Sequence, residues 1–283
     1  MLNGLLYMKN FTMGETTLNY NVFNADKEHT MLFIHGNSHS LKTFSNQYNS
    51  NYFKDYRLFF IDLPGHGESS KNGDYSLKNF ALIISEMIKT LDLKNIIIVG
   101  HSLGGHVAIN LLKHYKPMGL ILYGTPPLKN PFDSAAFLAN SNAGALGKQI
   151  ATTMEIESLM LEMNYKDESL KQGIEDYHRT DPAFRTDVFE DIINGVHENE
   201  ISLLNSFQGE IMFLLATSDS MINNNYILEE FQSNPYLELV EIVAGHSPHI
   251  EASESFNEKI YRFSKKIFYK RLVKNIIGNE LQQ

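Results

Sequence analysis

The stretch Ile96-Ile-Ile-Val-Gly-His-Ser-Leu-Gly-Gly105 decides the fold of this chain of 283 residues. Its first four residues are apolar and β-branched, as in a strand buried on both faces, and a run with helical spacing begins at Leu103. Between the two lies the pattern Gly-x-Ser-x-Gly, in which the glycines let strand and helix approach closely and leave the hydroxyl of Ser102 exposed above the sheet. The stretch therefore predicts a nucleophilic serine on a sharp strand-to-helix turn, with a plain helix N-cap as the alternative for Ser102.

Short apolar runs and helical patterns alternate on both sides of this turn, which predicts an α/β fold with a largely parallel sheet. Two early runs suggest a hairpin, and the last run alternates apolar and polar residues, as a strand near a sheet edge does. The expected strands are 7–11, 18–23, 31–34, 57–61, 96–99, 120–123, 210–215 and 237–243. Helices are expected over 76–91, where Ser76 can cap the start, over 103–115, and from about Ser253 onward.

The segment from about residue 125 to residue 205 contains no convincing strand, only polar turns and helical stretches such as 154–163. It is expected to be a helical cap inserted over the sheet, so that 1–124 and 206–283 form the core domain and 125–205 form the cap. Apolar cap residues would offer an adaptable surface to a small or medium hydrophobic substrate, although packing of the cap against the core explains most of them equally well. The candidates are Met154, Leu159, Met160 and Met163.

Ser102 needs a histidine base and an acid that orients it, because a serine hydroxyl is a weak nucleophile at its own pKa. The chain order for this kind of turn is Ser, then Asp or Glu, then His. Asp219 follows the strand that ends near Leu215, and His246 follows the last strand. Because the carboxyl ends of parallel strands converge at one edge of a sheet, Ser102, Asp219 and His246 are expected to meet there.

Other polar residues compete for these roles. His249 lies three residues beyond His246, but it falls at or inside the final helix, so the loop-borne His246 is favoured as the base. Asp62 stands ahead of Pro and Gly, where an aspartate satisfies local backbone amides. His66 and His101 are expected to be structural.

A tetrahedral intermediate needs two donors for its oxyanion. One is expected to be the backbone amide of Leu103, directly after the nucleophile, and the other the amide of Asn37, in the loop after the strand 31–34. This chemistry requires no metal and no organic cofactor.

Together these residues resemble the α/β-hydrolase superfamily. Their order and spacing are similar to the branch with a helical cap after the sixth strand, which includes small esterases, lactone hydrolases, carbon–carbon bond hydrolases and cofactor-free perhydrolases. The resemblance implies a core of about eight strands and an active site between core and cap. It covers nearly the whole chain and is carried by His35-Gly-Asn37, Asp62-Leu-Pro-Gly-His-Gly-Glu-Ser69, Gly100–Gly105, Asp219, Gly245-His-Ser-Pro-His-Ile-Glu251 and Phe256.

Several residues differ from those typical of other branches of this superfamily, and these differences disfavour some of the possible reactions. Haloalkane dehalogenases and epoxide hydrolases resemble the chain around Asn37 but use an aspartate nucleophile, where this chain has Ser102. A dehalogenase would also place a tryptophan after the nucleophile, and this chain has Leu103 there and no Trp at all. Both activities are therefore disfavoured. Ala216 replaces a glycine common in relatives, which leaves Asp219 as the acid, and no Gly-Gly-Gly run of the lipase type follows His35.

Composition excludes several function classes. With 24 Lys plus Arg against 33 Asp plus Glu the formal net charge is −9, which disfavours nucleic acid and anionic membranes as partners. No apolar run approaches the roughly 18 residues of a spanning helix. The absence of Cys rules out disulfides and fits a reducing compartment, so a soluble, cytoplasmic protein is expected. The basic, amphipathic stretch 265–274 is interpreted as a terminal helix packed on the sheet, with a membrane or partner surface as the alternative.

The sequence thus predicts a serine hydrolase that cleaves a carboxylic ester or related acyl bond of a small-molecule substrate through an acyl-enzyme. Carbon–carbon bond hydrolysis and perhydrolysis use the same three residues and remain open. So does a ligand receptor that keeps the fold but is selected for binding. The natural substrate and the oligomeric state are left open by the sequence.

Overall fold

The computed structural model describes residues 9–71, 73–139, 142–231 and 233–280, with side chains up to residue 273. Eight strands form one sheet in the order β1-β2-β4-β3-β5-β6-β7-β8. β1 and β2 form an antiparallel hairpin, β2 pairs antiparallel with β4, and all other pairs are parallel. The strands are β1 (Lys9–Met13), β2 (Thr16–Phe23), β3 (Thr30–Ile34), β4 (Arg57–Ile61), β5 (Ile96–His101), β6 (Gly119–Tyr123), β7 (Glu210–Ala216) and β8 (Leu237–Ile242). The predicted α/β fold with an eight-stranded, mostly parallel sheet is confirmed.

The ends of some elements differ from those expected. The first strand starts at Lys9, and the expected strand residues Tyr7 and Met8 lie outside the described residues. The helix expected over 103–115 is α3 (Leu103–Leu111). It ends early because the following amides, such as that of Lys113, bond three residues back in tight turns, and Pro117 disfavours helix before it. β8 lies at the sheet edge, as its alternating pattern predicts.

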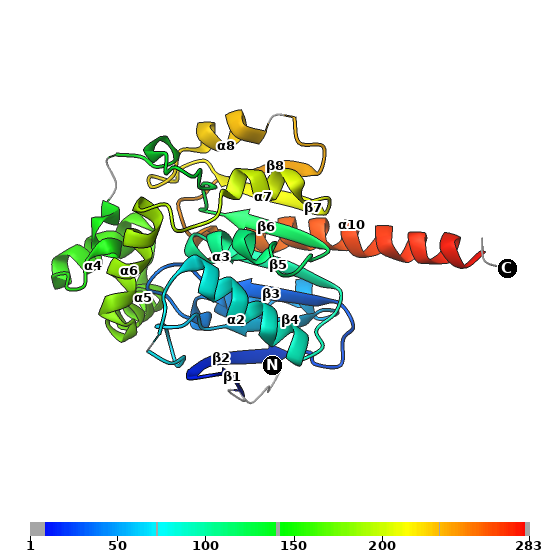
Figure 1. The fold of residues 1–283 in the computed structure, drawn as a ribbon, viewed down its shortest axis with the longest axis horizontal. Helices are drawn as coiled ribbons and strands as arrows, with labels where there is room; N and C mark the ends of the chain where they lie inside the picture. Colours follow the sequence, from blue (N-terminus) through cyan, green and yellow to red (C-terminus); the bar gives the residue numbers. More distant parts are fainter. Residues whose placement is uncertain (1–8, 72, 140–141, 232, 281–283) are drawn as a thin grey trace.

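Helices cover both faces of the sheet (Figure 1). On one face lie α2 (Leu77–Thr90), α3 and α7 (Glu200–Ser206), and on the other lie α1 (Ser45–Tyr48) and α10 (Ser253–Glu280). The start of α2 is capped as expected, since the hydroxyl of Ser76 accepts from the amide of Asn79 at 3.2 Å. Strand residues alternate between two buried clusters, with Leu32 and Ile34 facing α2 and α3 while Met31 and Phe33 face α10. The sheet is therefore the middle layer between two apolar cores.

The segment between β6 and β7 contains no described strand and forms helices at the carboxyl end of the parallel strands (Figure 1). The 3-10 turns η3 (Ser134–Ala136) and η4 (Asn142–Gly147) come first, followed by α4 (Thr153–Glu162), α5 (Asp167–Arg179) and α6 (Pro182–Ile193). α7 differs from these helices, because it packs against α3 on the face of the sheet. The expected boundary at residue 205 assigns α7 to the cap, whereas its contacts belong to the core.

The long final helix α10 begins at Ser253, as predicted, and lies against the sheet before its last turns extend past the amino-terminal ends of the parallel strands (Figure 1). Its apolar residues from Phe256 to Phe268 are buried in the same apolar core as Met31 and Phe33. This burial agrees with the interpretation of the helix as one that packs on the sheet. Within the described part of the chain, every helix is too short or too polar to cross a membrane.

Candidate active site

Ser102 occupies the turn between β5 and α3 in a strained conformation. Its φ of 50° and ψ of −116° lie in a region that residues other than glycine rarely adopt. Two bonds to the end of β6 hold it there: the amide of Ser102 donates to the carbonyl of Tyr123 at 2.9 Å, and the hydroxyl of Thr125 donates to the carbonyl of Ser102 at 2.9 Å. Such strain persists only where the surroundings over-determine it, and it is typical of active-site residues.

The glycines after Ser102 are required by close backbone approach. A Cβ on Gly104 would lie 2.2 Å from the carbonyl oxygen of Ile34, and one on Gly105 would lie 2.1 Å from the hydroxyl of Thr125. A Cβ on Gly100, the first glycine of the Gly-x-Ser-x-Gly pattern, would lie 2.6 Å from Cα of Gly105. Close packing around the turn therefore explains both glycines of the pattern, and Gly105 after it.

Asp219 and His246 form a buried pair in the loops after β7 and β8. His246 Nδ1 lies 2.9 Å from Asp219 Oδ2, and the two side chains are 3% and 0% exposed. Asp219 Oδ1 accepts from the amides of Met221 at 2.9 Å and Ile222 at 3.4 Å. Burial raises the pKa of Asp219, but the charge of His246 and these hydrogen bonds outweigh it and hold the pKa below its usual value. An ionised carboxylate only accepts hydrogen bonds, so Nδ1 of His246 donates to Asp219, and Nε2 is the ring nitrogen turned away from the carboxylate.

The loops that carry Ser102 and His246 approach each other around the end of β6. A Cβ on Gly124, the residue after β6, would lie 2.9 Å from Cε1 of His246, and Tyr123 next to it holds the amide of Ser102. From the other side, Nε2 of His101 donates to the carbonyl of His246 at 3.0 Å. The three loops that carry Ser102, Asp219 and His246 are thus brought together at one end of the sheet.

The loop after β3 lies beside Ser102, where a second oxyanion donor is expected. A Cβ on Gly36 would lie 3.4 Å from Cβ of Ser102. The side chain of Asn37 is turned to other partners, accepting from the hydroxyl of Ser38 at 2.8 Å and donating to the carbonyl of Leu146 at 3.3 Å. Among the described residues, no hydrogen bond is assigned to the backbone amides of Asn37 and Leu103. The arrangement leaves both amides available, and Leu103 stands at the positive end of α3.

The competing residues have structural partners. His249 lies in α9 (Pro248–Glu251), where its Nε2 is 3.0 Å from the hydroxyl of Thr43. His66 Nε2 accepts from the amide of Ser38 at 3.2 Å. Burial lowers the pKa of both histidines well below the ordinary value, so both are neutral.

Asp62 plays the turn-forming role that its sequence context predicts. It accepts from the backbone amides of Leu41 at 2.7 Å and Glu68 at 3.0 Å, and from the side chain of Asn19 at 2.7 Å. Because these donors belong to a turn and to neighbouring segments, Asp62 has a structural role, and the assignment of Asp219 as the acid stays a prediction.

His101 was predicted to be only structural. Its hydrogen bond to the carbonyl of His246 joins the strand before Ser102 to the loop that carries His246. Burial lowers the pKa of His101 well below the ordinary value, so it donates from Nε2 as a neutral ring. The only signal in the sequence is its place next to Ser102.

The four cap residues expected to bind substrate separate into two groups. Met154 is 76% exposed, so its side chain faces solvent and does not line an enclosed pocket. Leu159, Met160 and Met163 are buried in the first core cluster, and a Cβ on Gly173 of α5 would lie 2.7 Å from the sulfur of Met160. These three side chains are buried by apolar packing, and the expectation that the four residues bind substrate stays a prediction.

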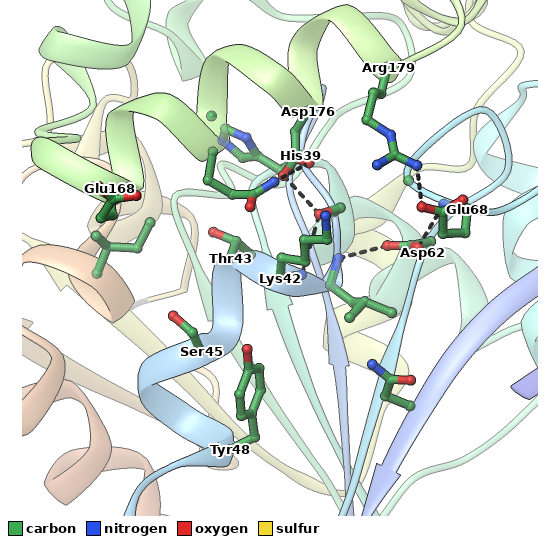
Figure 2. Close-up of a pocket in the computed structure, with 18 of the residues that line it drawn as sticks. His39, Lys42, Thr43, Ser45, Tyr48, Asp62, Glu68, Glu168, Asp176 and Arg179 are labelled. Carbon is green, nitrogen blue, oxygen red and sulfur yellow. Dashed lines mark hydrogen bonds and ion pairs between the residues drawn. The ribbon is translucent and has the colours of Figure 1, made fainter. Parts of the chain in front are cut away.

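A cleft of about 630 Å³ lies between α5 of the cap and the turn η1 (Leu41–Phe44) of the core (Figure 2), and the ring of its lining residue His39 is 6.3 Å from that of His101. Its lining includes His39, Tyr165, Asp176 and Arg179, but not Ser102, Asp219 or His246. The shape of the surface alone would favour this cleft as the functional site. The strained serine and the buried acid–base pair are the stronger evidence, because they carry chemistry that the cleft lacks.

Comparisons with known proteins agree with this geometry. The family model described as the alpha/beta hydrolase family matches residues 31–259. A Mycoplasma genitalium protein, whose name of esterase/lipase 2 is itself a proposal, is 22% identical over 247 residues, which are 84% of this chain and 89% of that protein. A Mycoplasma pneumoniae protein of the same name is 29% identical over 85 residues, only 32% of its own length.

Solved structures share the fold. The N-acyl homoserine lactonase AidH, in a complex with N-hexanoyl homoserine lactone, superposes with a TM-score of 0.84 at 23% identity, covering 92% of this chain and 98% of that one. An esterase from Rhodococcus gives a TM-score of 0.75 at 19% identity, covering 91% and 98%. Identities this low establish the fold and leave the substrate open.

Proposed function

This chain belongs to the alpha/beta hydrolase family, and we propose that it is a serine hydrolase that cleaves carboxylic esters or lactones through an acyl-enzyme. The observation that carries the proposal is the placement of the strained Ser102 turn and of the buried pair formed by His246 and Asp219 on loops at one end of the sheet. Neighbours named as esterases and as a lactonase support acyl chemistry at such a site.

In the proposed reaction, Nε2 of His246 removes the proton of Ser102 and the hydroxyl oxygen attacks the substrate carbonyl. The amides of Leu103 and Asn37 bind the oxyanion of the tetrahedral intermediate. His246 returns the proton to the leaving alcohol, and water then releases the acyl group by the same route. Asp219 keeps the proton of the neutral imidazole on Nδ1 and stabilises the imidazolium.

The test is hydrolysis of p-nitrophenyl esters from acetate to decanoate and of N-hexanoyl homoserine lactone, with the native chain and with Ser102→Ala. We expect turnover to fall by several orders of magnitude in the variant, because loss of the nucleophile leaves only oxyanion and binding effects. Ser218→Ala, on the loop of the acid, is a matched control and should keep its activity.

Equal rates in the native chain and Ser102→Ala would refute the proposed nucleophile. An absence of turnover in both proteins, together with no covalent labelling of Ser102 by a fluorophosphonate, would refute the hydrolase function and favour a receptor built on this fold. The preferred chain length of the ester measures the size of the acyl pocket.

A further inference from the structure

Arg185 of α6 is a buried cation without a counter-ion. The residue is 2% exposed. Among the described residues no carboxylate forms an ion pair with it. Asp181, at the start of the same helix, is already bonded to the amide of Ala183 and the hydroxyl of Tyr75. Burial of an unpaired charge costs several kcal/mol of folding free energy, so a buried arginine at this position needs a physical reason.

Carbonyl groups of the cap solvate the guanidinium. Nε donates to the carbonyl of Lys148 at 2.7 Å, Nη2 to that of Gln149 at 2.9 Å, and Nη1 to that of Tyr177 at 3.2 Å. The ring of Tyr177 stacks on it at 4.2 Å. These partners are dipoles, and the charge of Asp181 acts on Arg185 without forming an ion pair with it. Burial lowers the pKa of Arg185, yet a guanidinium stays protonated in proteins.

The same guanidinium reaches the loop after β3. Nη1 donates to the hydroxyl of Ser38 at 3.4 Å, and that hydroxyl donates to Oδ1 of Asn37 at 2.8 Å. The side-chain amide of Asn37 in turn donates to the carbonyl of Leu146, two residues before Lys148. One arginine thus joins a cap segment to the loop whose backbone amide is the proposed second oxyanion donor.

We propose that Arg185 is a positioning residue for the oxyanion, which fixes the loop of Asn37 through Ser38 and supplies positive potential where negative charge develops. The inference rests on the proposed function. A fixed charge in a site that excludes water stabilises a developing oxyanion without reorganisation, and the low local dielectric strengthens the effect. In this view the cap takes part in transition-state stabilisation as well as covering the site.

A purely structural role predicts a different outcome. If Arg185 only ties down carbonyls after η4, its loss lowers stability and leaves the turnover of the folded enzyme unchanged. If it acts on the oxyanion, its loss lowers kcat with little change in KM, because the substrate carbonyl carries no full charge before attack.

The experiment compares Arg185→Lys, Arg185→Met and Ser38→Ala with Arg179→Met, which removes an arginine from the surface of the neighbouring helix. Two quantities are measured: kcat and KM on the best p-nitrophenyl ester, and the rate at which a neutral fluorophosphonate labels Ser102, followed by intact mass. A thermal unfolding curve for each variant checks that it is folded at the assay temperature.

We expect Arg185→Met to lower kcat and the labelling rate by about 10- to 100-fold with KM within threefold, a smaller loss than that of a direct oxyanion donor. Arg185→Lys keeps the charge and should lose less. Ser38→Ala breaks the link to the loop and keeps the charge, so its loss should also be smaller than that of Arg185→Met. Arg179→Met should match the native chain.

A native labelling rate and native kcat in folded Arg185→Met would overturn the inference while the proposed function stands. Equal losses in the Lys and Met variants would overturn the electrostatic part and leave the positioning of the loop. Labelling and turnover that survive Ser102→Ala would instead show that the proposed function itself is wrong.

Discussion

The residue type at Gly104, next to the Ser102 turn, is fixed by the space available to its side chain. Gly104→Ala should destabilise the protein by about 3 kcal/mol or more, because its Cβ would lie 2.2 Å from the backbone oxygen of Ile34 and neither backbone can move alone. Gly144→Ala is the matched control, since a Cβ there meets nothing within 4 Å. Urea unfolding measures both variants. A Gly104→Ala protein as stable as Gly144→Ala would mean that α3 and β3 do not approach as described.

The hydrogen bonds of Asp219 determine how the side-chain amide would be oriented in Asp219→Asn. In Asp219→Asn the amide oxygen should stay on the amides of Met221 and Ile222, so the NH₂ group faces Nδ1 of His246. His246 would then carry its proton on Nε2 and could not act as a base. We expect kcat/KM to fall on the order of 10³- to 10⁴-fold. Asp133→Asn, an exposed cap of η3, is the control in the ester assay, and an equal activity of both variants would contradict the assignment.

The part of the candidate site that could be predicted from the sequence is the part that follows from backbone geometry. Ser102, Asp219 and His246 each follow a strand that is visible from its pattern, so their loops had to converge. Met154 could not be placed this way, because the rotation of a cap helix depends on its packing partners, and these came from α5. His101 and Arg185 were missed for a similar reason: their partners lie far away in the sequence, with 145 and 147 residues separating them from His246 and Ser38.

At the scale of elements, Glu200 joins the two ends of the cap insertion to α3. Its side chain is fully buried and accepts from His106 and Asn110 of α3, each at 2.8 Å, and from the amide of Leu128 at 2.9 Å. The amide of Glu200 also donates to the carbonyl of Leu128 at 2.8 Å. The same contact explains why α7 lies on the core although it belongs to the inserted segment.

Removal of this carboxylate should therefore destabilise the protein strongly. Glu200→Ala removes the acceptor of His106 Nδ1 and of the Leu128 amide, while Asn110 Nδ2 keeps only its bond to the carbonyl of His106. We therefore expect a loss of about 3 kcal/mol in the free energy of unfolding. Glu198→Ala, two residues earlier and bound only to exposed lysines, should lose less than about 1 kcal/mol. Urea unfolding of the two variants side by side tests this. A similar, small loss in both would remove Glu200 as the link between cap base and α3.

At the scale of the whole molecule, the parallel sheet could be predicted and the closure of the cap could not. Unbroken apolar runs such as 96–99 indicate strands covered on both faces, which requires helices on each side. The cap instead meets the core through pairs of residues that lie far apart in the sequence. Phe184 of α6 stacks on Phe80 of α2, the hydroxyl of Ser40 donates to Asp176 Oδ2 at 2.8 Å, and the hydroxyl of Tyr165 lies 3.1 Å from His39 Nε2. Such pairs leave no periodic trace in a sequence.

One of these contacts makes global stability depend on pH. Asp176 lies on α5 in the cleft that also holds Asp62 and Lys42 (Figure 2). Burial raises its pKa to about 6; hydrogen bonds from Ser40 and Gln172 oppose the rise, and the charge of Asp62 adds to it. The pKa of an unfolded aspartate is about 3.9. Because the folded state holds the proton more tightly, the stability that protonated Asp176 contributes is present below about pH 4 and is lost as pH rises through about 6.

Asp176→Asn removes this titration. The stability of the variant relative to the native chain should therefore increase by about 2 kcal/mol between pH 4 and pH 7.5, whatever the absolute effect of the substitution. Urea unfolding at both pH values gives the difference, and the change with pH is the decisive quantity because lost hydrogen bonds shift both measurements together. Glu175→Gln, the exposed neighbour on α5, should show no comparable change. If Asp176→Asn also shows none, Asp176 is ionised in the folded protein well below pH 6, and the cap is joined to the core by an ordinary, solvated carboxylate.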